Sequence, residues 1–143
     1  MALMQIEHGS PEYHKMVKLR DELLRKPLGL SFSREDLEKE KEDILVGAFD
    51  DDKILACCLL TKADKETVRL RQMAVKKNQQ GKGIGHSMML FAETLAKDKG
   101  FKKLMMHARD TAIGFYEKQG YRVKGEQFFE VTIAHHVMEK NLF

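Results

Sequence analysis

A glycine-rich segment near the middle of the chain has the residue types and spacing of an anion-binding loop. It reads Gln80-Gly81-Lys82-Gly83-Ile84-Gly85-His86, with an apolar run before it and a helical pattern after it. Glycines at alternate positions remove side chains where a backbone has to approach another group closely. The free N–H groups of such a loop and of the next helical turn point outward, and the helix dipole favours an anion there. Because Lys82 adds a positive charge, the segment predicts a pyrophosphate site.

Two better-known phosphate-binding patterns do not fit this segment. A Walker loop needs Gly-x-x-x-x-Gly-Lys-Ser/Thr, and no lysine-hydroxyl pair follows a glycine at that spacing. The dinucleotide pattern Gly-x-Gly-x-x-Gly would put His86 at its third glycine, and it normally follows the first strand of a parallel sheet. What remains is Gln-x-x-Gly-x-Gly, from Gln80 to Gly85. A tight strand-to-helix turn without a ligand is the alternative interpretation.

Other side chains that could do chemistry give weaker signals. Phe115 and Tyr116 lie on a predicted helix, where aromatic residues are more typical of a core than of a catalytic site. Cys57 and Cys58 are adjacent and cannot form an ordinary unstrained bridge with each other. The histidines show no ligand spacing and no Cys-x-x-Cys accompanies them, so we expect no metal site. These histidines are His8, His14, His86, His107, His135 and His136.

The elements that must position the glycine segment follow from hydrophobic periodicity and turn residues. Ser10-Pro11, and Ser33 with Asp36, are typical helix starts. Three strand-like runs separated by turn residues predict an antiparallel meander that ends just before the glycines. The second half alternates helix and strand, which gives the order β-α-α-β-β-β-α-β-α-β-β and a mixed α/β sheet. The predicted helices cover 11–25, a short segment from 33, a segment from 85 to a cap at 100, and 111–119; the strands cover 44–49, 53–60, 67–75, 101–108, 121–128 and 130–139.

Length and composition bound the broad class of protein. A chain of 143 residues is about one domain's worth, so we expect a single domain over residues 1–143. Its 43% hydrophobic and 33% charged residues are typical of a soluble globular protein. The net charge of +3 is too small to indicate nucleic-acid binding, and no apolar run approaches the roughly 20 residues of a membrane helix. With no export signal at its start, the chain is expected in the cytoplasm.

Two motifs resemble those of the GNAT superfamily of N-acetyltransferases. The run Met73-Ala-Val with Gln80-Gly-Lys-Gly-Ile-Gly is similar to motif A of that superfamily, and Ala112-Ile-Gly-Phe-Tyr116-Glu-Lys-Gln-Gly120-Tyr is similar to motif B. They occur in the right order and about the right distance apart, and the resemblance extends over essentially the whole chain. Pro27-Leu-Gly-Leu, His107-Ala-Arg and Ile133-Ala-His135 further resemble a bacterial, uncharacterised subgroup of the superfamily.

The resemblance implies a GNAT fold, a mixed and splayed central sheet of about seven strands flanked by about four helices. Acetyl-CoA would lie between the fourth and fifth strands. The N–H of Met73 would bind the acetyl carbonyl, that of Val75 the pantetheine arm, and the loop the pyrophosphate. Tyr116 would be the general acid that protonates the departing thiolate. The residues that the resemblance assigns to the cofactor are Met73, Ala74, Val75, Gln80, Gly81, Lys82, Gly83, Ile84, Gly85 and His86.

The implied activity is transfer of an acetyl group from acetyl-CoA to a primary amine by direct attack. Two positions depart from the family pattern. Arg109 stands where an asparagine often precedes the motif B tyrosine, and Arg69 stands where histone-type members have a glutamate base. The sequence therefore names no general base. A CoA-binding sensor or regulatory module that kept the fold and lost turnover is the alternative hypothesis.

The acceptor is expected to be a small-molecule or peptide amine, with no nucleic-acid or membrane partner; a homodimer is left open. In the strand before the glycine loop, Arg69 and Arg71 alternate with Val68 and Leu70, so the two arginines share one face. If they line the amine's pocket, they favour an acceptor that carries a carboxylate or phosphate. The alternative is that they are solvated, or paired with acidic residues of the second helix such as Glu38 or Glu42.

Overall fold

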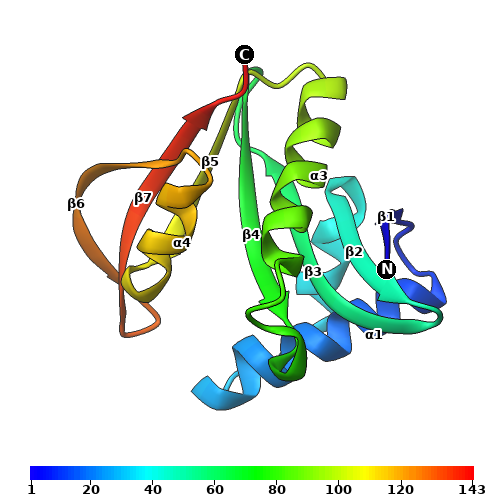
Figure 1. Ribbon diagram of the computed structural model, residues 1–143. Coiled ribbons are helices and arrows are strands. Elements are labelled where there is room, and N and C mark those ends of the chain that lie inside the picture. The colour runs from blue at the N-terminus through cyan, green and yellow to red at the C-terminus, as the bar shows by residue number, and fades with distance from the viewer.

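A computed structural model describes all 143 residues and contains one seven-stranded sheet with helices on both faces (Figure 1). The strands lie side by side in the order β1-β2-β3-β4-β5-β7-β6. The elements are β1 (Ala2–Ile6), α1 (Pro11–Arg20), α2 (Arg34–Glu38), β2 (Ile44–Asp50), β3 (Lys53–Lys62), β4 (Thr67–Val75), α3 (Ile84–Asp98), β5 (Lys103–Arg109), α4 (Ile113–Lys118), β6 (Arg122–Glu130) and β7 (Ile133–Asn141). The predicted α/β class, the seven strands and the four α-helices are confirmed.

The sheet splits between β4 and β5, its only parallel pair. Residues Thr67–Leu70 of β4 pair with Lys103–Met106 of β5, and no pairing continues beyond them. From Arg71 onward the two strands part, as Figure 1 shows, and β5, β6, β7 and α4 form a separate wing. Backbone groups along the open stretch of β4 therefore face a gap instead of a neighbouring strand.

A bulge in β4 lies where this gap begins. The register between β3 and β4 shifts between Cys57 and Leu59, and Gln72 has a φ of 52°. A positive φ is uncommon for a residue other than glycine, so the surrounding structure has to hold Gln72 in that conformation. The bulge bends the strand away from β5 because an extra residue on one strand increases the local twist.

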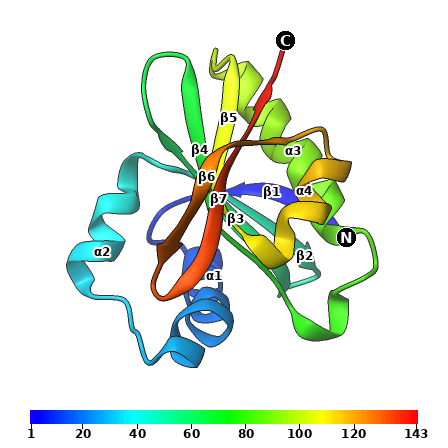
Figure 2. The same ribbon diagram turned by 90° about the vertical axis from the view of Figure 1, so that its left-hand side faces the viewer.

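Helices α1 and α2 cover one face of the sheet, and α3 and α4 cover the other (Figure 2). Alternation along β3 sends Cys57 into the core under α1 and Cys58 into the core under α3. Both cysteines are fully buried and free, as expected from their adjacency. None of the helices is long and apolar enough to cross a bilayer.

The helix starts predicted at Ser10 and Ser33 are confirmed, whereas other helix bounds differ. Ser10 accepts the backbone N–H of Tyr13, and Ser33 forms a capping box with Asp36. The first helix is α-helical only to Arg20 and continues as a π-helical turn over Asp21–Arg25 and a 3₁₀ turn over Lys26–Leu28. The helix predicted over 111–119 likewise opens with a 3₁₀ turn, Asp110–Ala112. These turns carry the chain to the edge of the gap between β4 and β5.

Candidate active site

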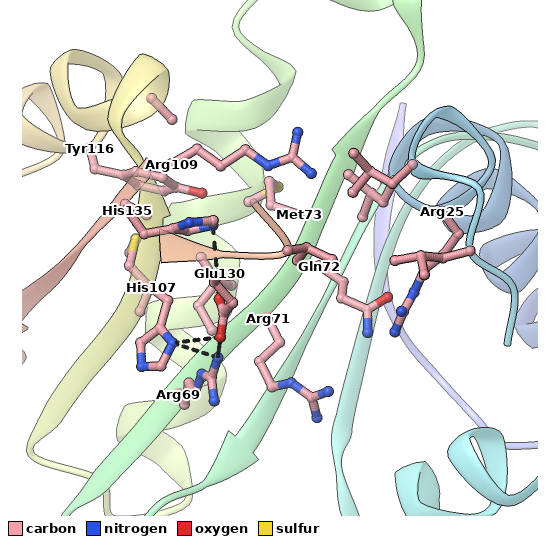
Figure 3. A pocket seen from close by; sticks show the side chains of 18 residues that line it. Arg25, Arg69, Arg71, Gln72, Met73, His107, Arg109, Tyr116, Glu130 and His135 are labelled. Carbon is pink, nitrogen blue, oxygen red and sulfur yellow. Dashed lines mark hydrogen bonds and ion pairs between the residues drawn. The ribbon is translucent and has the colours of Figure 1, made fainter. Parts of the chain in front are cut away.

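A cavity of about 460 Å³ opens at the point where β4 and β5 part (Figure 3). That volume lies within the range of small-molecule sites in proteins, about 300–1,000 Å³. The turns after α1 close one side, β4 and β5 form the floor, and α4 with the β6–β7 hairpin closes the other side. The lining residues are Leu24, Arg25, Leu28, Leu30, Arg69, Leu70, Arg71, Gln72, Met73, Met106, His107, Ala108, Arg109, Ala112, Tyr116, Glu130, Val131 and His135.

Tyr116 reaches the cavity from α4. Its ring packs edge-on against Phe115 and Tyr121, with centroids 5.1 and 6.1 Å away. Burial raises the pKa of Tyr116, with the Cys58 thiol as a smaller cause, and no hydrogen bond contributes to that shift. The phenol therefore stays protonated at neutral pH and keeps its O–H available, as a proton donor at this place requires.

The end of β4 presents unpaired backbone N–H groups to the gap. The N–H of Lys76 donates to the carbonyl of Leu55 in β3, at 2.9 Å. Because the N–H groups of a strand alternate in direction, those of Val75 and Met73 point to the opposite edge, where β5 no longer pairs. Ala74 pairs with β3 and buries its side chain. Only Met73 of these three lines the cavity itself.

The glycine loop lies at the end of the same strand but outside the cavity. Gly81 and Gly83 both have a φ of 81°, and Gly83 is the N-cap of α3. A Cβ on either would meet nothing within 4 Å, so the space above the loop is open. Lys82 is exposed beside them. The conformation leaves the first N–H groups of α3 free, which is the arrangement that binds anions at helix starts.

Two loop residues have partners that the sequence did not indicate. The Gln80 side chain donates to the carbonyl of Val75, at 3.0 Å, and so ties the loop to β4. The imidazole of His86 contacts the Gln119 side chain at the end of α4. Gly85 lies against the Phe115 ring, which a Cβ would approach to 3.1 Å. The loop is thereby fixed against α4, the helix that carries the cavity's tyrosine.

Arg69 and Arg71 line the cavity on the face opposite the buried Val68 and Leu70, as the alternation predicts. Arg71 donates to the Thr61 hydroxyl over 3.4 Å and takes part in none of the ion pairs within 4.0 Å. Desolvation, with the nearby Arg71 as a smaller cause, lowers the pKa of Arg69. Its Nε–H is buried without any hydrogen-bond partner.

The expected alternative for these arginines, pairing with the second helix, is wrong. Arg69 contacts His107 Nδ1 at 3.0 Å and a Glu130 oxygen at 4.0 Å. Glu38 pairs with Lys41 instead. Glu40, two residues after α2, pairs with Arg20 of α1, whereas Glu130 at the end of β6 is the carboxylate that lies 4.0 Å from Arg69.

The sequence reasoning missed Glu130, His107 and His135, which meet at one wall of the cavity (Figure 3). Glu130 contacts His107 Nδ1 at 3.3 Å and His135 Nε2 at 3.8 Å. It is the last residue of β6, just before a two-residue turn in which Val131 and Thr132 have φ values of 48° and 63°. Such values are strained for β-branched residues. The local signal was the segment Ile133-Ala-His135, but its spacing gave no partner.

No group of three or more His, Cys, Asp or Glu side chains has an arrangement that could hold a metal ion. His136, the neighbour of His135, pairs with Asp110 at 2.7 Å on the outside of the cluster. Hydrogen bonds from Gln127 and then His136 lower the pKa of Asp110. These contacts hold the start of α4 against β7.

Comparison with known proteins decides the family. The profile of the acetyltransferase (GNAT) family matches residues 4–121, which include the glycine loop and Tyr116. The chain belongs to the GNAT acetyltransferase family. The N-acetyltransferase YjcF of Bacillus subtilis, itself uncharacterized, is 32% identical over 108 residues, 75% of either chain. The uncharacterized protein YyaT of the same organism is 30% identical over 76 residues, 53% of this chain; the chain spans only about half of YyaT, 51%.

Solved structures show the same GNAT fold over the full chain. A Lactobacillus plantarum protein assigned provisionally as an N-acetyltransferase has a TM-score of 0.86 and 25% identity, with 100% of each chain covered. An aminoglycoside 6'-N-acetyltransferase in complex with coenzyme A has a TM-score of 0.87 and 15% identity, with 100% of this chain and 98% of that one covered. Acyl transfer is the chemistry of this family, and the acceptor is a separate question.

Within this GNAT chain, Arg109 occupies the position where the family motif often has asparagine. The side chain lines the cavity at the end of β5 and forms no ion pair. The cavity is therefore rich in arginine: Arg25, Arg69, Arg71 and Arg109 line it, against the single carboxylate of Glu130.

Proposed function

We propose that this chain is an acetyl-CoA-dependent N-acetyltransferase that moves the acetyl group to a primary amine by direct attack. The observation that carries the proposal is the cavity at the strand split, where the Met73 backbone and Tyr116 meet in one space. An N–H at the acetyl oxygen stabilises the oxyanion that forms as the amine attacks. A protonated phenol on the opposite wall can supply the proton that the departing sulfur needs.

Acetyl-CoA as the co-substrate agrees with the family and with the coenzyme A bound by an aminoglycoside acetyltransferase of the same fold. In the proposed arrangement, the open loop from Gly81 to Gly85 holds the pyrophosphate, with Lys82 beside it. The free N–H groups of Met73 and Val75 bind the arm of acetyl-CoA that carries the thioester where it enters the cavity. His86 and Gln80 act through the loop, because their side chains are bonded to Gln119 and to the Val75 carbonyl.

The acceptor in this proposal is an amine that also carries a carboxylate or phosphate. Arg71 supports this substrate class because it lines the cavity with no carboxylate partner. Arg25 faces the same space, stacked on the Phe32 ring at 4.5 Å. A guanidinium binds a carboxylate or phosphate through two parallel hydrogen bonds, which would hold the amine for attack.

The test is a turnover assay with acetyl-CoA and a panel of amino acids, phosphorylated aminosugars, aminoglycosides, peptides and polyamines, read by release of free thiol. Turnover on at least one anionic amine is the expected result. Binding of acetyl-CoA without thiol release on any amine would favour a sensor that kept the fold.

The loop has its own test in Gly83→Asp compared with Gly83→Asn. Both residues tolerate a left-handed backbone, so the two variants share any strain and differ in charge. We expect acetyl-CoA at 100 times its Kd to stabilise the wild type by about 2.7 kcal/mol. The shift should vanish in Gly83→Asp, because a carboxylate repels the pyrophosphate, and largely persist in Gly83→Asn. Equal affinities of the two variants in titration calorimetry would remove the loop from the site.

A further inference from the structure

Glu130 is the only carboxylate on the cavity wall, and its side chain is 43% exposed. The charged or titratable groups in contact with it come from three strands: Arg69 from β4, His107 from β5 and His135 from β7 (Figure 3). None of these contacts is shorter than 3.3 Å, so the carboxylate is oriented but not closed off. It shares the cavity with Tyr116 and with the backbone of Met73.

The two contacts of His107 Nδ1 require opposite protonation states of that nitrogen. Its Nδ1 lies 3.0 Å from the Arg69 guanidinium and 3.3 Å from a Glu130 oxygen. A guanidinium can only donate, so Nδ1 must be without a proton for the first contact. A carboxylate can only accept, so Nδ1 must carry a proton for the second. Without a proton, Nδ1 accepts from Arg69, and with a proton, Nδ1 donates to Glu130.

The ring of His135 lies on the other side of the carboxylate, with Nε2 3.8 Å from a Glu130 oxygen. Its Nδ1 donates to the carbonyl of Ile133 over 2.7 Å, so the ring is fixed on β7 with Nε2 toward Glu130. The ring is buried, and it stacks on Phe128 at 5.8 Å. His107, in contrast, is 26% exposed and can exchange a proton with water.

An acceptor amine needs a proton acceptor in such a site. An alkylamine with a pKa of about 10.4 is neutral in only about 1 molecule in 2,500 at pH 7, and only the neutral form attacks a thioester. The ordinary pKa of an imidazole is about 2 units higher than that of a carboxyl group, so the imidazole binds a proton more tightly. A carboxylate beside an imidazole can therefore collect the proton and pass it on.

We propose that Glu130 takes the proton of the acceptor's ammonium group and that His107 receives it next, an inference that rests on the proposed acetyl transfer. The ammonium nitrogen gives one proton to a Glu130 oxygen, which passes it to His107 Nδ1 and then to water. The neutral nitrogen forms the N–C bond with the acetyl carbon. As the C–S bond breaks, the sulfur takes the proton of Tyr116, and the nitrogen's second proton restores the phenol through solvent. The sum is one amide, one thiol and one released proton.

The experiment measures kcat/KM against pH for Glu130→Gln, with the amine that gives the fastest thiol release in the panel. At pH 7 the variant should lose about 10²-fold in kcat/KM, the lower end of the usual effect of a proton acceptor. Below the amine's pKa its kcat/KM should then rise about tenfold per pH unit, because the neutral fraction of the amine does so, and approach the wild type near pH 9.5. Glu126→Gln is the matched control, since Glu126 is exposed on the same strand and outside the cavity. It should behave as the wild type does.

A loss in Glu130→Gln that is equal at pH 7 and pH 9.5 would assign Glu130 to binding alone and overturn the proposal, as would a loss below about threefold. Wild-type turnover and the thermal shift with acetyl-CoA are measured first. A wild type that binds acetyl-CoA and releases no thiol overturns the proposed acetyl transfer itself. This result comes from the wild type alone, so it is distinguished from a failure of the Glu130 proposal.

The second step has a readout that needs no turnover. In ¹⁵N NMR spectra of the wild type, the neutral His107 ring should have a bare Nδ1 and a protonated Nε2, because Nδ1 accepts from Arg69. Arg69→Met should release this tautomer preference. A neutral His107 with its proton on Nδ1 in the wild type would exclude the transfer from Glu130.

Discussion

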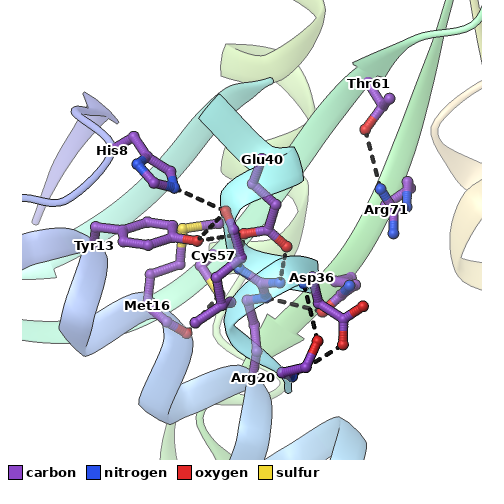
Figure 4. A network of polar contacts seen from close by, with 12 residues as sticks. His8, Tyr13, Met16, Arg20, Asp36, Glu40, Cys57, Thr61 and Arg71 are labelled. Atoms are coloured by element: carbon purple, nitrogen blue, oxygen red, sulfur yellow. Dashed lines mark hydrogen bonds and ion pairs between the residues drawn. The ribbon is translucent and has the colours of Figure 1, made fainter. Parts of the chain in front are cut away.

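Arginine meets glutamate at two places beside β4, once in the core and once at the cavity wall. In the core, Arg20 donates to both oxygens of Glu40 over 2.9 and 2.5 Å, and the two side chains are 0% and 4% exposed (Figure 4). Tyr13 donates to the same carboxylate over 2.7 Å. At the cavity wall, Arg69 and Glu130 are 33% and 43% exposed and 4.0 Å apart.

The difference lies in how completely the groups are bonded. Arg20 uses its remaining Nε–H to hold Gln72, the bulge residue of β4, at 2.9 Å. Arg69 instead has a buried Nε–H with no partner. The closed cluster, Arg20 with Glu40, fixes the backbone that shapes the cavity. The open cluster, Arg69 with Glu130, keeps a hydrogen-bond donor free for a ligand. The same residue types thus support the fold in one place and face the chemistry in the other.

The largest expected effect comes from breaking the closed cluster. Arg20→Met should destabilise the fold by about 3–5 kcal/mol, because it leaves the Glu40 charge buried without a partner. Arg69→Met, the matched change in the open cluster, should cost less than about 1 kcal/mol, since that pair is long and solvated. Urea unfolding of both variants gives the two free energies. Similar losses of unfolding free energy in the two variants would mean that solvent exposure does not decide how much each cluster stabilises the fold.

Much of this arrangement could be predicted from sequence because its signals are local. The helix caps at Ser10 and Ser33 and the order of the elements depend on neighbouring residues, and the structure confirms them. The motifs around Gly83 and Tyr116 likewise identified the family. Alternation along β4 gave the correct faces for its arginines because a strand has a fixed two-residue period.

The partners of those arginines could not be predicted in the same way. Glu130 comes 61 positions after Arg69 (130 − 69) and meets it only because the β6–β7 hairpin reaches over β4. Arg20 and Gln72 are joined across 52 positions through the bulge. No periodicity encodes such contacts. The closed and open clusters both depend on tertiary geometry, and so does the candidate proton acceptor.

One tyrosine belongs to the buried Arg20–Glu40 cluster and another lines the cavity, which allows a matched test of roles. Tyr116→Phe should lower turnover by about 10²-fold or more and leave acetyl-CoA affinity and stability nearly unchanged, because the phenol donates no hydrogen bond that holds the fold. Tyr13→Phe should keep turnover and cost about 1–3 kcal/mol of stability, since it removes a buried hydrogen bond to Glu40. Thiol release and urea unfolding provide the two measurements. Turnover of Tyr116→Phe within about twofold of the wild type would make Tyr116 a core aromatic.

The smallest expected effect concerns the arginine that neither cluster satisfies. Arg71 lines the cavity and has only the long bond to Thr61, so it is the guanidinium most available to a substrate anion. Arg71→Ala should lower kcat/KM about tenfold for an amine with a carboxylate or phosphate, which corresponds to about 1.4 kcal/mol for one lost charge-assisted contact. It should change kcat/KM little for the same amine without that group.

The control for this preference is Arg69→Ala, because Arg69 already contacts His107 and Glu130 and is less available to a substrate anion. If Arg71 binds the anion, its removal should narrow the ratio of kcat/KM between the matched amines more than removal of Arg69 does. Spermidine separates the charge models further, since the arginines repel its additional cations and it should react more slowly than any anionic amine. Should spermidine react fastest, or should neither alanine change alter the ratio, the open cluster would select its acceptor through Glu130 and not through arginine.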